Sequence, residues 1–168
     1  WMLRTTRGLF GRTGVTWPVR TTSPFGPRLL PEGCVFGHKG PAAIPKAGAL
    51  VSPLALLGFL ASRPSRLLLS LRLGAGDDAP GSAAKGYEVG LLRDLPFPRL
   101  GEGKELCLTS AAMDATRAAK ALKVSDDETT NAFVAPGLLE GGGRTSIREL
   151  VEGRLRRSEA AWKVLARR

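Results

Sequence analysis

Closely spaced prolines are the strongest restriction on how the first half of this chain can fold. Eight of the 12 prolines lie within the first 64 residues, and the chain also contains 21 glycines. Proline lacks a backbone N–H, and its ring clashes with the carbonyl four residues earlier in a helix. We therefore expect residues 1–46 to form an extended arm without long regular structure, ordered by a partner.

The positive charge of the chain is concentrated in the same part. The net charge is +10, and residues 1–76 carry ten Lys and Arg side chains against one acidic residue, Glu32. Residues 77–168 carry 15 basic and 14 acidic side chains, so they are almost neutral. An excess of this size indicates an anionic partner, either nucleic acid or a membrane surface.

The first 12 residues have the pattern of an organellar targeting signal. On a helix, Met2, Leu3, Leu9 and Phe10 fall on one side and the arginines on the other, with no acidic residue nearby. This Arg-rich amphipathic pattern resembles a mitochondrial targeting peptide. It predicts a mitochondrial location, in the matrix or on the matrix side of the inner membrane.

The apolar segment, residues 47–76, begins with an uncharged stretch from 47 to 62 bounded by Lys46 and Arg63. A membrane-spanning helix needs about 20 apolar residues, and Pro53 interrupts this shorter stretch. Two interpretations stay open: a membrane-embedded segment, or a buried hairpin or stretch packed against a partner protein.

Regular structure is expected only near the C-terminus. Residues 77–108 read as a turn-rich linker, in which Pro96 and Pro98 stop any helix begun at Leu91. The region 109–168 is predicted to be helical, with one helix from about 111 to 123 and a second starting at a capping box of Ser125 and Glu128. The fold class is thus mainly α, with long irregular extensions, a Pro/Gly-rich basic N-terminal arm and a small C-terminal helical region.

The strongest predicted helix runs from residue 147 to about 167. Ser146 and Glu149 form a capping box, and the apolar residues that follow lie within one arc of the helix. Arg154 falls inside that arc, so it should pair with a carboxylate or a phosphate, or extend along the rim. The predicted partner-binding residues are Ile147, Val151, Arg154, Leu155, Trp162 and Leu165.

No motif predicts catalysis, a metal or a cofactor. Cys34, Cys107 and the single histidine, His38, are too few for a closed zinc site. The glycine-rich stretch from 137 to 146 lacks the lysine of a phosphate-binding loop. We therefore expect a chain that is not an enzyme.

Two functions fit these observations. The first is a structural subunit of a mitochondrial ribosome whose basic arm contacts rRNA and whose helices bind proteins of a large complex. The alternative is an accessory subunit of an inner-membrane respiratory or ATP synthase complex, membrane-associated through residues 47–62. The location of the charge favours the ribosome, and the predicted RNA-binding residues are Arg4, Arg7, Arg12, Arg20, Arg28, Lys39 and Lys46.

Overall fold

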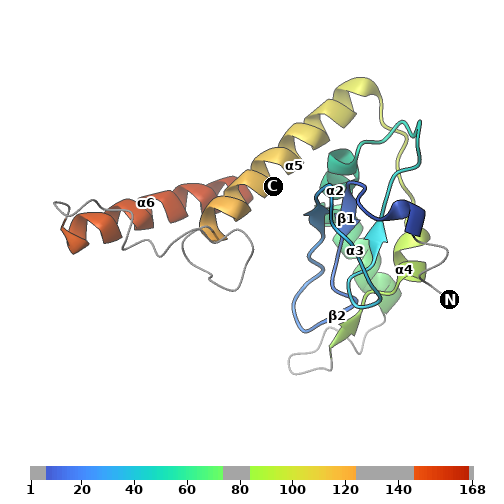
Figure 1. Ribbon diagram of the computed structural model, residues 1–168, viewed down its shortest axis with the longest axis horizontal. Helices are drawn as coiled ribbons and strands as arrows, with labels where there is room; N and C mark the ends of the chain where they lie inside the picture. Colours follow the sequence, from blue (N-terminus) through green and yellow to red (C-terminus); the bar gives the residue numbers. More distant parts are fainter. Residues whose placement is uncertain (1–6, 74–83, 124–145, 167–168) are drawn as a thin grey trace. The chain divides into compact units, whose positions relative to one another are not determined.

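The computed structural model describes residues 7–73, 84–123 and 146–166, and within the last two helices it does not describe every side chain. The chain divides into two compact units, which we call unit 1 (residues 1–112) and unit 2 (residues 113–168). The elements are mainly helical, as the sequence predicted (Figure 1).

A small antiparallel sheet lies in unit 1. It has the strand order β3-β1-β4, formed by Arg28–Leu30, Gly14–Thr16 and Ala42–Ala43. Val15 is paired with Leu29 on one side and with Ala43 on the other. The strands are only two or three residues long, in agreement with the close spacing of the prolines.

Side chains alternate in direction after β1. Val15, Trp17 and Val19 are buried, whereas Thr16 and Pro18 are only half-buried. This period of two is typical of a strand with one face toward a core. The segment continues into β2 (Arg20–Thr21), which pairs with the distant strand β5 (Lys85–Gly86).

Two short helices lie next in the chain; the first packs against β1 and β3, and the second packs against the first. Helix α2 (Pro53–Ala61) is followed after Ser62 by α3 (Arg63–Leu73), with a bend of 62° between them. Pro64 cannot donate a backbone hydrogen bond to α2, so α2 ends and Ser62 adopts an extended conformation. The hydroxyl of the fully buried Ser65 closes this corner by donating to the Phe59 carbonyl at 2.6 Å.

Helix α5 (Glu102–Lys123) begins earlier than predicted. The sequence assigned residues 77–108 to a linker and placed the helix start near Thr109, but the described part of that segment holds β5, α4 (Val89–Arg93) and the first turns of α5. Glu102 and Glu105 in the first turn stabilise the helix start, because their negative charge interacts favourably with the positive end of the helix dipole. The Glu105 carboxylate also accepts a hydrogen bond from the Ser52 backbone at 2.9 Å, which joins α5 to the start of α2.

The core of unit 1 draws on all four predicted segments. Its buried residues are Val15, Trp17, Phe25, Leu57, Leu60, Leu69, Tyr87, Leu95 and Ala112. The first three come from the predicted arm, so residues 7–46 are not an appendage: they supply strands and core side chains. The prediction of an extended arm ordered only by a partner does not hold for these residues, because their large apolar side chains are buried in one cluster with residues of α2, α3 and the segment after β5.

Helix α6 (Ile147–Ala166) of unit 2 confirms the predicted helix and its cap. The Ser146 hydroxyl accepts from the Glu149 backbone at 3.2 Å, and a Glu149 carboxylate oxygen accepts from the Ser146 backbone at 3.0 Å. This reciprocal pair satisfies donors that a helix start leaves unpaired. The helix predicted from Ser125 and the glycines of the stretch 137–145 lie outside the described residues.

Candidate nucleic-acid interface

Most of the predicted RNA-binding side chains lie on the surface of unit 1. Arg7 is in the short 3-10 helix η1 (Arg7–Leu9), Arg20 in β2 and Arg28 in β3, and all three are exposed. Lys39 is exposed in the turn between Gly37 and Gly40, and Lys46 is exposed after β4. Arg4 lies outside the described residues.

Arg12 has a structural contact that the sequence did not reveal. It is half-buried, and its Nη2 atom donates to the Pro45 carbonyl at 2.8 Å. Arg12 and Lys46 line one surface cavity of about 480 Å³, which also includes the carboxylate of Glu32. The acidic side chain partly offsets the two cations, so this cavity is a weaker anion site than its basic residues alone would indicate.

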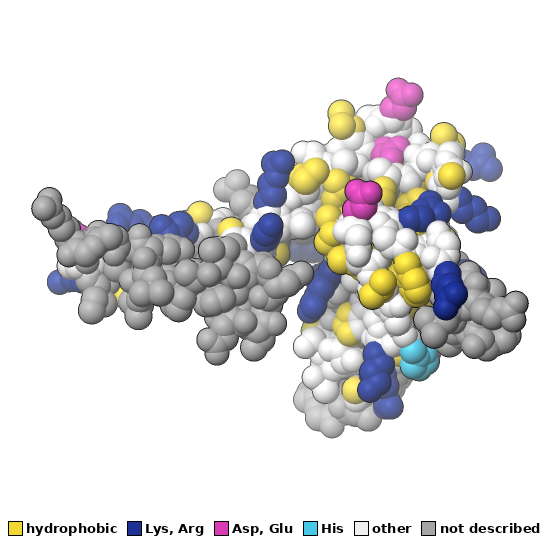
Figure 2. All heavy atoms as spheres, viewed as in Figure 1, with side chains coloured by type: hydrophobic (Ala, Val, Ile, Leu, Met, Phe, Trp, Pro, Cys, Tyr) yellow, Lys and Arg dark blue, Asp and Glu magenta, His cyan; other side chains and the backbone are white. Residues whose placement is uncertain are grey.

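The described residues of unit 1 carry a large positive excess. Residues 7–73 and 84–112 contain thirteen Lys and Arg side chains against five acidic ones, an excess of eight positive charges. In the face shown in Figure 2, the basic side chains are distributed over this unit and do not form one continuous stripe. The arrangement suits several separate phosphate contacts.

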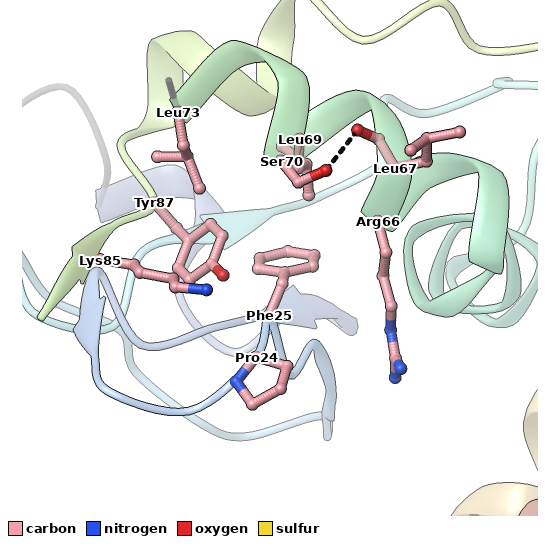
Figure 3. A pocket seen from close by; sticks show the side chains of 9 residues that line it. All are labelled: Pro24, Phe25, Arg66, Leu67, Leu69, Ser70, Leu73, Lys85 and Tyr87. Atoms are coloured by element: carbon pink, nitrogen blue, oxygen red, sulfur yellow. Dashed lines mark hydrogen bonds between the residues drawn. The ribbon is translucent and has the colours of Figure 1, made fainter. Parts of the chain in front are cut away.

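Some of the cations that carry this excess were missed by the sequence prediction. Arg66 of α3 and Lys85 of β5 line a second cavity, which we call the aromatic cavity, of about 320 Å³ (Figure 3). The described residues that line it are Pro24, Phe25, Arg66, Leu67, Leu69, Ser70, Leu73, Lys85 and Tyr87. In the sequence, the spacing of Lys85 and Tyr87 two positions apart was the one local indication that both side chains could share a face. It lay in a segment that was predicted to be a linker.

Two of the predicted partner-binding residues of α6 have described side chains. Val151 is 45% exposed and Leu155 is 59% exposed. The side chains of Ile147, Arg154, Trp162 and Leu165 lie outside the described residues. An ion pair on this helix joins Arg148 to Glu152 at 3.1 Å, four residues apart.

In residues 7–73, 84–123 and 146–166, no three His, Cys, Asp or Glu side chains are placed to hold a metal ion. Within these ranges no single helix is long and apolar enough to cross a membrane, although the bent pair α2 and α3 meets the requirement when the two are joined. Cys34 and Cys107 are free thiols.

Comparisons with known proteins gave no match to a family model, a curated protein or a solved structure.

Proposed function

We propose that this chain is a non-catalytic structural subunit of a large mitochondrial assembly, in the first place a mitoribosomal protein. In this proposal unit 1 contacts rRNA through its exposed cations, and α6 contacts neighbouring proteins through Val151 and Leu155. The observation that carries the proposal is the excess of eight positive charges on the described part of unit 1. A matrix location is part of the proposal and is supported by the acid-free, Arg-rich start of the chain.

The short strands suit this role. A turn-rich backbone places Arg20, Arg28 and Lys39 at separate points of the surface, each exposed to solvent. Phosphates recur along an RNA backbone, so separate cations can each neutralise one. No continuous groove is needed for this kind of binding.

The alternative function is an accessory subunit of an inner-membrane respiratory or ATP synthase complex. It is favoured by the outward leucines of α3, Leu67 and Leu71, which are 60% and 71% exposed. Against it, Ala55, Leu57 and Leu60 of the uncharged stretch are buried within unit 1. Those side chains would have to leave the core before they could contact lipid.

Salt dependence of RNA binding tests the first function. If the five exposed predicted cations each neutralise a phosphate of single-stranded RNA, the logarithm of affinity should fall with the logarithm of salt with a slope of about −3.5. Replacing Arg20, Arg28 and Lys39 by glutamine should flatten that slope by about two units.

Arg93 provides the matched control. It is 80% exposed but lies 3.6 Å from the Asp94 carboxylate, so Arg93→Gln should leave the slope almost unchanged. A salt-independent association, together with retention of the chain in carbonate-washed mitochondrial membranes, would replace the ribosomal proposal by the membrane alternative. Co-sedimentation with ribosomes in high magnesium would support the ribosomal one.

A further inference from the structure

We propose that the aromatic cavity of unit 1 holds one nucleotide of single-stranded RNA, with its base in the cavity and its two flanking phosphates near Arg66 and Lys85. This inference rests on the proposed function and adds a specific subsite to it. Its basis is the set of residues that β5 and α3 bring to one place.

Two regular elements direct their side chains into this cavity. Lys85 and Tyr87 are two positions apart along β5 and its extension, so both point to the same side. On α3, Ser70 and Leu73 lie four and seven positions after Arg66. These three residues therefore share one helix face with Leu69. Pro24 and Phe25, from the loop between β2 and β3, complete the lining.

The floor of the cavity is formed by buried, mainly apolar side chains. The rings of Phe25 and Tyr87 lie with their centroids 4.9 Å apart and are tilted by 48°. Each residue is 3% exposed and Leu69 is 1% exposed, so these side chains define the shape of the cavity without standing free in solvent. Tyr87 is further held by its backbone, which donates to the Val19 carbonyl at 2.6 Å and accepts from the Trp17 indole at 2.9 Å.

The cations lie on opposite sides of that floor. Figure 3 shows the Phe25 ring between Lys85 on one side and Arg66 on the other. An apolar floor between two cations matches an RNA chain, in which every base lies between two phosphates.

The size of the cavity is sufficient for one base. Its volume of about 320 Å³ is at the lower end of the range for small-molecule sites. Arginine is well suited to the phosphate side, because its guanidinium donates two parallel hydrogen bonds to an anion.

A comparison of two RNA probes tests the proposal on the full-length chain. The probes are an oligouridylate and an abasic oligonucleotide of the same length, which has the same phosphates but no bases. We expect the oligouridylate to bind about fivefold more tightly or better, since contact between one base and an apolar site is worth about 1 kcal/mol or more. Ser70→Trp should abolish this preference by filling the cavity while every cation is retained.

Matched variants separate the cavity from general charge. Ser70→Ala, which loses only a hydrogen bond to the Leu67 carbonyl within α3, should keep the preference. Arg66→Gln should weaken the preference for the oligouridylate over the abasic probe. Arg63 is on the same helix but outside the cavity lining, so Arg63→Gln should weaken binding of both probes equally. If Ser70→Trp does not fold, as judged by circular dichroism, the comparison of Arg66→Gln with Arg63→Gln decides the question.

The outcomes distinguish the two proposals. Equal affinity of the wild-type chain for both probes, with the steep salt dependence intact, would overturn the nucleotide subsite and leave the proposed function standing. A base preference that survives Ser70→Trp in a folded variant would also overturn the subsite. If neither probe binds, the proposed function fails and this inference fails with it.

Discussion

Replacement of Trp17 tests whether residues 7–46 belong to the folded unit. Trp17 is 3% exposed, and its indole Nε1 atom donates to the Tyr87 carbonyl at 2.9 Å. Truncating a buried aromatic side chain to alanine costs about 3–5 kcal/mol, against a total stability of about 5–15 kcal/mol for a typical domain. With a urea dependence of about 2 kcal/mol per molar, Trp17→Ala should lower the unfolding midpoint by about 2 M.

The assay is urea unfolding of the full chain followed by far-UV circular dichroism. Trp17→Phe should lose less, about 0.5–1.5 kcal/mol for the hydrogen bond in addition to a smaller packing loss. Val35→Ala is the control from the same segment, because Val35 is 73% exposed and its replacement should change stability by about 0.5 kcal/mol or less. An unchanged midpoint for Trp17→Ala would refute the placement of this segment in the core and restore the extended arm.

Three further predictions concern packing and caps. A Cβ at Gly14 would lie 2.7 Å from the Ala43 carbonyl oxygen, so Gly14→Ala should cost about 1–3 kcal/mol in thermal unfolding, whereas Gly37→Ala, with nothing within 4 Å, should not show a steric loss. Ser65→Ala removes a fully buried hydroxyl that donates to a backbone carbonyl, and should destabilise unit 1 by about 1–3 kcal/mol; equal urea midpoints for this variant and wild type would contradict that. Ser146→Ala should cost the start of α6 about 1 kcal/mol, visible as faster amide hydrogen exchange in its first turn, and unchanged exchange would mean that the cap is not needed.

The features that the sequence predicted correctly depend on neighbours within about one helical turn. The capping box of Ser146 and Glu149 involves residues three positions apart, and it marks the observed start of α6. The prolines at 96 and 98 follow the end of α4, which extends only to Arg93. Steric clashes and capping hydrogen bonds between residues this close in sequence depend only on the local residues. They can therefore be predicted from the sequence directly.

The features that the sequence did not predict depend on residues far apart. Arg20 pairs with Gly86, and the Trp17 indole bonds to Tyr87, which lies 70 residues further along the chain. The sequence around one partner does not indicate where the other lies. The alternation of buried Val15, Trp17 and Val19 spans only five residues, and the surrounding prolines make a strand there difficult to predict. A segment therefore reads as an arm or a linker until its partner strand is known.

The candidate site divides in the same way. The sequence by itself determined the positive charge of the first part and the identity of its exposed arginines and lysines, because charge follows from composition alone. Only the tertiary structure decided that Arg12 is held by the Pro45 carbonyl, and that Arg66 and Lys85 flank a shared cavity. The physical reason is that burial of Phe25 and Tyr87 against α3 brings these cations from separate segments to one place, and the hydrophobic effect that drives such burial has no fixed range along the chain.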